Sequence, residues 1–155
     1  MVSRTPSKLE AVEKRIKKEN KDVQTCLIQF DFAGATSMDE YEKLRSQVVA
    51  MGMDVSLLVV NAGMILFGQL TNQSLKEVQS MMDINMYHPT AMLKKFLPEL
   101  SERKGQSGIV IVSSTAANVA APALAVYAAS KAYLSTLCLA IDGELASSDR
   151  TRIDM

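Results

Sequence analysis

The sequence is poor in the residues that mark metal sites and disulfide frameworks. Its 155 residues include two cysteines and one histidine. Cys26 and Cys138 are far apart, and neither has a CxxC or Cys/His companion, so neither a disulfide framework nor a zinc site is indicated. We therefore expect reduced, buried thiols and no metal.

The sequence also lacks an excess of charge of either sign. Seventeen Lys and Arg balance seventeen Asp and Glu, so the formal net charge is zero. This balance argues against a dedicated site for nucleic acid or for an anionic membrane. A small, mostly apolar ligand is the more natural partner.

No apolar segment follows the first residues, so no signal peptide or membrane anchor is visible. The uncharged stretch 105–130 is long enough to cross a bilayer, but it contains Gln106, Asn118, Pro122 and several hydroxyl side chains. We interpret it as soluble core, and expect the chain alone to be soluble and cytoplasmic.

What the sequence does contain is a regular alternation of helical and strand patterns. With 48% apolar and 22% charged residues, its composition is that of one globular domain, residues 1–155. The predicted helices are Thr5 (N-cap) to Lys21, Ser37 (cap) to Met51, Leu75 to Met82, Met86 to Leu100 and Leu124 to Leu145. The predicted strands are Val23 to Phe30, Val55 to Val60, Gly108 to Val112 and Thr151 to Met155.

Such alternation predicts parallel strands joined by helical crossovers, hence an α/β fold. The apolar runs Val55 to Val60 and Gly108 to Val112 show little polar alternation, which is typical of strands covered by helices on both faces. The chain begins at what reads as a strand end and stops as a strand begins. We therefore expect a single partial domain: a Rossmann-type, doubly wound parallel sheet lacking the first two strands and the C-terminal strands.

One helix carries a pair of residues suited to acid and base chemistry. Tyr127 and Lys131 are four apart on the Ala-rich helix, so they share a face, and a nearby ammonium favours the phenolate. Ser114 follows a strand, at the edge where ligands of open α/β sheets bind, and its hydroxyl can bond a substrate carbonyl. Asn61-Ala62-Gly63 follows the neighbouring strand.

With these motifs in this order, the sequence resembles the short-chain dehydrogenase/reductase family. The motifs are N61-A-G63, Asn85 in MDINMYHP, Ser114 in IVIVSSTA and Y127-AAS-K131. The resemblance covers essentially the whole chain. The segments SRTPSKLEAVEKRI and DRTRID most resemble the branch that contains very-long-chain 3-oxoacyl-CoA reductase and type 12 17-beta-hydroxysteroid dehydrogenase.

The resemblance implies a role for each matched position. Tyr127 would donate a proton to the carbonyl oxygen, Ser114 would orient that carbonyl, and Lys131 would tune Tyr127 while bonding the nicotinamide ribose. Asn85 would hold a water in the proton relay. The residues alone leave other readings open: Asn85 as a helix-breaking polar residue, and Ser113 in place of Ser114 at the crevice.

The resemblance also implies a cofactor. Asn61, Ala62, Gly63, Tyr127 and Lys131 would contact it, Asp31 in QFDFAG would bond the adenine, and Arg4 would bind the 2′-phosphate of NADP (NADPH). Arg4 as an exposed terminal charge and Asp31 as a strand-end cap remain open alternatives. No GxxxGxG is present, so the glycine-rich pyrophosphate loop is absent from this sequence.

Two functions follow. The first is an oxidoreductase: NADPH-dependent reduction of a 3-oxoacyl-CoA or ketosteroid carbonyl, in lipid or steroid metabolism. The second is a truncated, cofactor-deficient fragment without activity, at most an interaction partner of a full-length subunit. If the branch resemblance holds, the parent protein would lie in the endoplasmic reticulum.

Three structural expectations can be tested directly. The Tyr127 hydroxyl should lie within hydrogen-bond or one-water distance of the Ser114 hydroxyl, with Lys131 on the same side. Leu93, Phe96, Leu134 and Cys138 should form an exposed apolar face, used in a homodimer. The strand Val23 to Phe30 should pair directly with Val55 to Val60, which would displace Asp31 and prevent NADPH from fitting.

Overall fold

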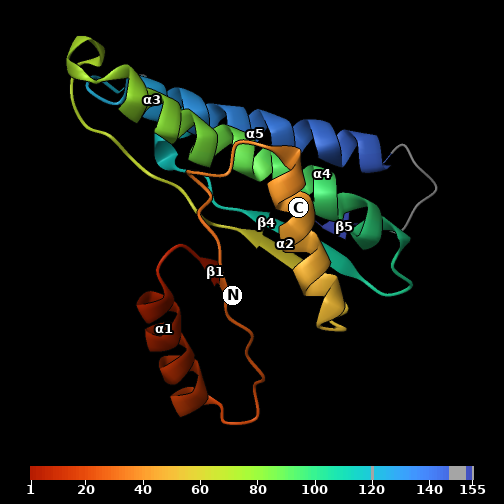
Figure 1. The fold of residues 1–155 in the computed structure, drawn as a ribbon. Helices are drawn as coiled ribbons and strands as arrows, with labels where there is room; N and C mark the ends of the chain where they lie inside the picture. The colour runs from red at the N-terminus through yellow and green to blue at the C-terminus, as the bar shows by residue number, and fades with distance from the viewer. Residues whose placement is uncertain (120, 147–152, 155) are drawn as a thin grey trace.

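A computed structural model describes residues 1–119, 121–146 and 153–154 (Figure 1). Strands and helices alternate along it, and all three strand pairs are parallel, so the predicted α/β class is confirmed. In chain order the elements are β1 (Val2–Ser3), α1 (Pro6–Glu19), β2 (Ile28–Gln29), α2 (Met38–Ala50), β3 (Leu57–Val60), η1 (Leu70–Asn72), α3 (Leu75–Met82), η2 (Asp83–Tyr87), α4 (His88–Glu102), β4 (Ser107–Ile111), η3 (Thr115–Asn118), α5 (Ala125–Ala146) and β5 (Ile153–Asp154). Of the predicted last strand, residues 151, 152 and 155 lie outside the described residues.

Several helix ends follow directly from capping residues. Ser37 and Ser74 begin α2 and α3 with capping boxes, in which Glu40 and Glu77 bond back to the serines. These hydrogen bonds hold the pKa of both carboxyls below its usual range. After α2, Gly52 adopts a φ of +66°, a left-handed conformation that suits glycine and ends the helix as predicted.

The predicted helix Met86 to Leu100 is part of a longer helical run. The π turn η2 joins α3 to α4 without a break, and α4 extends to Glu102, so Pro98 lies inside the helix and close to its end. A π turn inserts one extra residue into a helix and re-aims the side chains around it. The side chain it re-aims here is Asn85.

The predicted pairing of Val23 to Phe30 with Val55 to Val60 is wrong. The strands form two separate sheets, β1-β2 and β3-β4-β5. The backbone N-H groups of Ile28 and Phe30 donate to the carbonyls of Met1 and Ser3 at 2.9 and 3.1 Å. The first residues thus provide a short strand that satisfies β2. The displacement of Asp31 expected from direct pairing does not occur.

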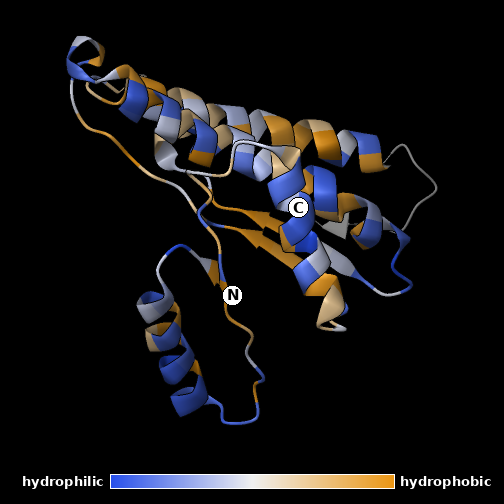
Figure 2. Cartoon of the chain, viewed as in Figure 1, coloured by the Kyte–Doolittle hydropathy of each residue, from blue (hydrophilic) through white to orange (hydrophobic). Residues whose placement is uncertain are grey.

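The core lies between the three-stranded sheet and α4, which packs against β3 and β4. Leu58 and Ile109 point into this core, where they meet Leu93, Phe96 and Leu100 of α4. The opposite face of the sheet is bare: Leu57 is 56% exposed and Val59 is 55% exposed. Figure 2 shows these apolar strands below the helices. The predicted cover of helices on both faces is therefore wrong for the described residues.

The prediction of an exposed apolar face on α4 and α5 is also wrong for three of its four residues. Leu93, Phe96 and Leu134 are at most 3% exposed and fill the chain's own core. Leu93 and Phe96 belong to the core formed by α4 with β3 and β4. Cys138 is half-buried, and burial raises the pKa of its thiol. Cys26, expected to be buried, is exposed.

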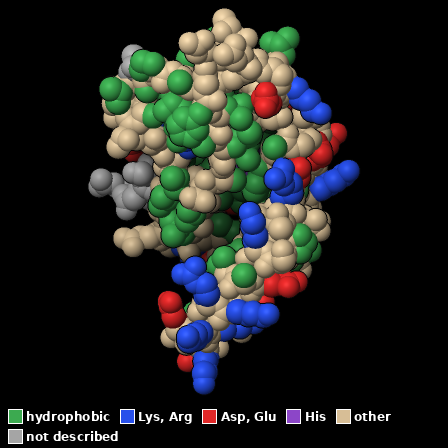
Figure 3. Space-filling model, turned by 90° about the vertical axis from the view of Figure 1, so that its left-hand side faces the viewer, with side chains coloured by type: hydrophobic (Ala, Val, Ile, Leu, Met, Phe, Trp, Pro, Cys, Tyr) green, Lys and Arg blue, Asp and Glu red, His purple; other side chains and the backbone are tan. Residues whose placement is uncertain are grey.

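The N-terminal lobe, residues 1–30, projects below the rest of the chain (Figure 1). Figure 3 shows Lys and Arg side chains gathered at the level of this lobe and hydrophobic side chains above them. An aromatic contact joins the lobe to the main body, because Phe30 packs on Phe32, and the Phe32 ring lies 3.8 Å from that of His88 on α4.

Candidate functional site

Asn85 forms the centre of the candidate site. The π turn buries its side chain, which accepts a hydrogen bond from the Met64 N-H at 2.9 Å. Its amide nitrogen donates to the Met64 carbonyl at 2.9 Å and to the Ser130 hydroxyl at 3.0 Å. Asn85 therefore fixes the turn after β3 against helix α5. Asn85 does not break the helix, because the π turn that contains it continues from α3 into α4.

Lys131 lies beside the same turn. Its side chain is buried, donates to the Val112 carbonyl at 2.8 Å, and has its Nζ 5.9 Å from the centre of the Tyr127 ring. A Cβ added at Gly63 would lie 3.1 Å from Asn85 Oδ1 and 3.5 Å from Lys131 Nζ. Glycine lets the two polar side chains approach the backbone closely at this position, where a Cβ would press on Asn85.

Tyr127 presents an uncommitted hydroxyl. Its ring is half-buried, its carbonyl accepts from the Ser130 hydroxyl at 2.7 Å, and its phenol oxygen has no hydrogen-bond partner among the described residues. The backbone is therefore fixed while the phenol is available to a ligand. The spacing of Tyr127 and Lys131 on one helix face is as predicted.

The two adjacent serines have different surroundings. The Ser113 hydroxyl donates to the Lys131 carbonyl at 3.1 Å and lies 3.2 Å from the Ser135 hydroxyl, so it faces α5. Ser114 follows in extended conformation, which turns its side chain away from that of Ser113. Its hydroxyl accepts from the Ala116 N-H at 3.2 Å. The approach of Ser114 to the Tyr127 hydroxyl stays a prediction.

Arg4 and Asp31 meet at the carboxyl ends of β1 and β2. The Arg4 guanidinium lies 4.0 Å from Asp31 Oδ1, which also accepts from the Ala33 N-H at 3.2 Å. Both side chains are substantially exposed. This pair belongs to the two-stranded sheet, whereas Asn61, Ala62 and Gly63 follow the three-stranded one. The candidate cofactor residues are thus divided between two sheets.

These residues fit the two ends of a dinucleotide better than its middle. The close packing of Gly63, Asn85 and Lys131 leaves a small-residue backbone turn beside an ammonium, which suits a ribose and nicotinamide. For the pyrophosphate, the sequence contains no glycine-rich turn opening a helix, the structure that usually cradles phosphates.

Sequence reasoning missed two residues that organise the site. Ser130 is fully buried and connects Asn85 to the Tyr127 backbone. His88 lies three residues after Asn85. Its ring packs against that of Phe32, the residue that follows Asp31. The sequence offered one signal for each residue. Ser130 stands within the motif YAASK, and His88 is the single histidine of the chain and lies in a predicted helix.

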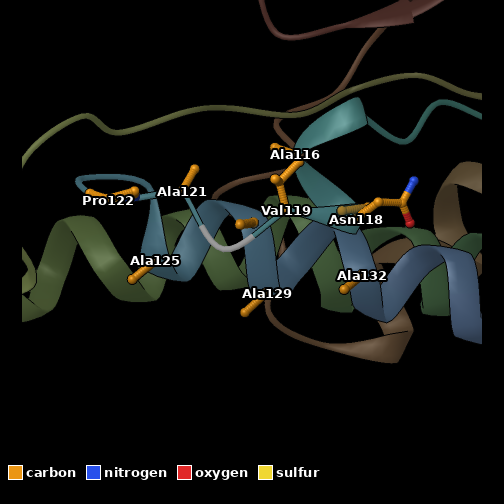
Figure 4. A pocket seen from close by; sticks show the side chains of 10 residues that line it. Ala116, Asn118, Val119, Ala121, Pro122, Ala125, Ala129 and Ala132 are labelled. Carbon is orange, nitrogen blue, oxygen red and sulfur yellow. The ribbon is translucent and has the colours of Figure 1, made fainter.

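One hollow lies next to the candidate site rather than in it. It has a volume of about 590 Å³. Alanines of α5 and the segment after β4 line it: Ala116, Ala117, Asn118, Val119, Ala121, Pro122, Ala125, Ala128, Ala129 and Ala132 (Figure 4). Ser114, Tyr127 and Lys131 are not among them. Since Asn118 is its one long polar side chain, the hollow lacks groups for chemistry.

A family model for short chain dehydrogenases matches residues 1–153. The chain belongs to this family. Its α/β fold, parallel strands and ordered motifs agree with that membership. Within the described residues, no group of three or more His, Cys, Asp or Glu could hold a metal ion, and no helix is both long and apolar enough to span a bilayer.

Relatives of known name resemble most of the chain. It is 33% identical over 152 residues to the very-long-chain 3-oxoacyl-CoA reductase of Mycosarcoma maydis, covering 96% of this chain and 42% of that protein. It is 32% identical over 147 residues to the enzyme of the same name from Ajellomyces capsulatus, covering 94% of this chain and 42% of that one. The chain spans less than half the length of these relatives.

Solved structures show the same fold. A metagenomic short-chain oxidoreductase in complex with NADP is 27% identical, with a TM-score of 0.83, and is matched over 94% of this chain and 62% of its own. A short-chain dehydrogenase from Streptomyces avermitilis is 21% identical, with a TM-score of 0.81, over 99% of this chain and 52% of its own.

Proposed function

We propose that this chain carries the proton-transfer site of an NADPH-dependent ketoreductase that acts on a 3-oxoacyl-CoA or a ketosteroid. The observation that carries the proposal is the position of Lys131, buried between the turn at Gly63 and the Tyr127 ring. An ammonium held there stabilises a phenolate, so Tyr127 can release and recover a proton. The 3-oxoacyl-CoA reductase names of the relatives support the substrate class.

The chain's own residues would handle the carbonyl and the proton. A nicotinamide held beside Gly63 and Lys131 would supply the hydride for the carbonyl carbon. The Ser114 hydroxyl donates to the carbonyl oxygen and fixes its position. The Tyr127 hydroxyl transfers its proton to that oxygen as the new C-H bond forms. Lys131 holds the charge that remains on the phenol oxygen until solvent restores the proton.

The structure supports a positioning role for Asn85. Both hydrogens of its amide nitrogen are committed, to Met64 and Ser130. Its oxygen has one lone pair left beyond the bond from the Met64 N-H. Through that lone pair Asn85 can accept a hydrogen bond from a relay water, while its other bonds hold the turn and α5 together.

The adenine end of the cofactor would contact the other sheet. Arg4 would bind the 2′-phosphate, and Asp31 the adenine. Since these two side chains now lie 4.0 Å apart and are exposed, their ion pair costs little to open. Replacing Arg4 by Glu should weaken the binding of NADPH more than that of NADH.

A second candidate, a cofactor-deficient partner of a full-length subunit, has its own support. The sequence has no GxxxGxG, and the strands form two sheets rather than one. Without backbone N-H groups around the pyrophosphate, a dinucleotide would be held only at its ends. This candidate predicts that the isolated chain shows no saturable binding of NADPH.

Titration of the purified chain with NADPH, followed by nicotinamide fluorescence, separates the two candidates. Saturable binding, followed by consumption of NADPH when a 3-oxoacyl-CoA is added, supports the reductase. The Tyr127→Phe variant should bind NADPH equally well and lose turnover by at least about a hundredfold. Binding without turnover in both proteins would refute the catalytic assignment, and absence of binding would favour the deficient chain.

Two further proposals concern the setting of the enzyme. The outer side of α5 offers Leu139, which is 76% exposed, for a homodimer contact. Crosslinking that shows only a monomer would refute it. We also propose an endoplasmic-reticulum location for the longer protein to which this branch corresponds, which imaging of a tagged protein would test.

A further inference from the structure

The segment after β2 carries Asp31 past the end of the two-stranded sheet. The ladder between β1 and β2 ends with the bond from the Phe30 N-H to the Ser3 carbonyl, at 3.1 Å. The exposed Asp31 side chain accepts from the Ala33 N-H at 3.2 Å, and the Asp31 carbonyl accepts from the Ala35 N-H at 3.0 Å. These bonds shape a local turn, but they do not connect the turn to the main body of the chain.

Phe32 connects this turn to the helices. Its side chain is buried, and its ring centre lies 3.8 Å from that of His88, with an angle of 39° between the two ring planes. Since Phe32 and Asp31 are adjacent in the chain, a shift of the Phe32 backbone also moves Asp31. The contact between the two rings therefore bears on where the Asp31 carboxylate lies.

His88 is itself held from two directions. It begins α4, and its backbone N-H donates to the Asp83 carbonyl across the π turn η2. Its side chain is buried and its ring stacks on that of Tyr41 of α2, with ring centres 6.0 Å apart and an angle of 24°. Tyr41 is also buried and packs edge-on against Tyr87. His88 thus presents a fixed surface to Phe32.

The link between His88 and Phe32 is a contact between rings. The Nδ1 atom of His88 is buried and has no hydrogen-bond partner among the described residues. The position of Phe32 therefore depends on the shape of the ring at position 88 and not on a hydrogen bond from it. Another aromatic ring of similar size should make the same contact.

The π turn reaches both ends of the proposed cofactor site. Asn85 and His88 lie three positions apart on one continuous helical run. Asn85 bonds the Met64 backbone in the turn after β3, and His88 contacts Phe32 beside Asp31. One helical element thereby connects the turns that follow β2 and β3.

We propose that His88 is a positioning residue for the adenine end of the cofactor site. Its ring holds Phe32, and Phe32 holds the turn at Asp31 in the conformation that receives the adenine. The inference rests on the proposed function, in which Asp31 contacts the adenine. His88 then affects the binding of the cofactor without touching it.

Hydrogen exchange tests the positioning without any ligand. The amides of Ala33 and Ala35, which donate to Asp31, are compared in the wild type, His88→Ala and His88→Phe. Their exchange should be at least about tenfold faster in His88→Ala and unchanged in His88→Phe, which keeps a ring against Phe32. The Met64 amide, bonded to Asn85, is the internal reference and should keep its rate.

Binding of adenosine 2′-monophosphate, measured by calorimetry, tests the effect on the ligand. This probe carries the adenine and the 2′-phosphate but no pyrophosphate. His88→Ala should weaken its binding at least about tenfold, and His88→Phe should bind it as the wild type does. His88→Leu fills most of the space without a ring, so it protects the test against a loss of folding and should give an intermediate weakening.

Two further variants separate positioning from general stability. Phe96→Leu, in the core between α4 and the sheet, should lower stability without changing the affinity for the nucleotide. Phe32→Ala should weaken binding about as much as His88→Ala does. Combining the two should have little further effect, because one residue acts through the other.

Each failure has a distinct meaning. Equal affinities of the wild type and His88→Ala, or a His88→Phe variant as weak as His88→Ala, would refute the inference and leave the proposed function intact. Additive losses in the double variant, or exchange at Met64 that accelerates as much as at Ala33, would also refute it. A wild type that does not bind the nucleotide would refute the adenine contact of the proposed function, and the inference with it.

Discussion

Asn85 and Met64 exchange two hydrogen bonds, both of 2.9 Å, between a π turn and the turn after β3. The carboxamide thereby pairs with both the N-H and the C=O of one residue. This arrangement fixes the Asn61 to Gly63 turn, on which the candidate cofactor contacts depend.

Replacement of Asn85 by Ala should therefore destabilise the chain by about 2 to 4 kcal/mol, because it leaves the Met64 groups and the Ser130 hydroxyl without their partner. Urea denaturation measures the loss. Asn72→Ala, at an exposed position, is the control and should change stability by less than about 0.5 kcal/mol. An Asn85→Ala variant as stable as the wild type would contradict the central role of this side chain.

The stability of the chain should depend on the hydroxyl of one tyrosine of α5 and not on that of another. Tyr133→Phe should cost about 1 kcal/mol, because the Tyr133 hydroxyl lies 2.6 Å from that of Thr90. Tyr127→Phe should change stability by less than about 0.5 kcal/mol, since its hydroxyl has no partner among the described residues. Thermal unfolding of both variants tests this. A larger loss for Tyr127→Phe would show that its hydroxyl has a structural role.

Substitution of the two adjacent serines should have different effects: one should lower stability and the other should lower turnover. Ser113→Ala should cost about 1 kcal/mol of stability, because its hydroxyl bonds the Lys131 carbonyl and contacts Ser135. Ser114→Ala should lower turnover strongly with little effect on the binding of NADPH. Turnover and urea denaturation are measured on both variants. If Ser113→Ala abolishes turnover while Ser114→Ala does not, the assignment of the two serines is reversed.

Gly63 and Gly143 offer a matched pair of glycine substitutions. Gly63→Ala should destabilise by about 1 to 3 kcal/mol, because the new methyl would press on Asn85, which is bonded on both sides. A Cβ added at Gly143 would have nothing within 4 Å, so Gly143→Ala should stabilise α5 by about 0.5 to 1 kcal/mol. Chemical denaturation of both variants measures the difference, and a neutral Gly63→Ala would show that the turn can retreat from Asn85.

The pH dependence of stability should contain a contribution from His88. Burial lowers the pKa of His88 to about 4, whereas an unfolded histidine titrates near 6.5. Between these values the unfolded chain binds more protons, so stability falls as the pH is lowered from about 6.5 to 4, by up to about 3 kcal/mol from this group. His88→Phe keeps a ring against Phe32 and should flatten the curve in this window. Parallel curves for the two proteins would contradict this contribution.

Most of the fold could be predicted because its elements are strongly patterned. The predicted helix Leu75 to Met82 has the same bounds in the structure, where Ser74 and Glu77 form a capping box at its start. The strands of the central sheet were placed within two residues, because apolar runs between turns leave little freedom. The order of chemical motifs identified the family before any geometry was known.

The pairing of the sheets could not be predicted because it depends on a two-residue strand. Val2 and Ser3 are too few to give a periodic signal, yet they pair with Ile28 and Gln29 and so place β2 in a sheet separate from that of β3. The inward orientation of Leu93 and Phe96 was likewise hidden, since a helix with apolar residues on several sides does not show which side meets its own sheet. Ser130 lay unnoticed between two recognised residues because its role depends on Asn85, far away in sequence.

The aromatic contact between Phe32 and His88 bears on how the chain denatures. The lobe of residues 1–30 has its own short sheet and helix, so it can open while the sheet packed on α4 remains intact. Probes placed in the two parts would then report different midpoints, and one melting temperature would not describe the chain.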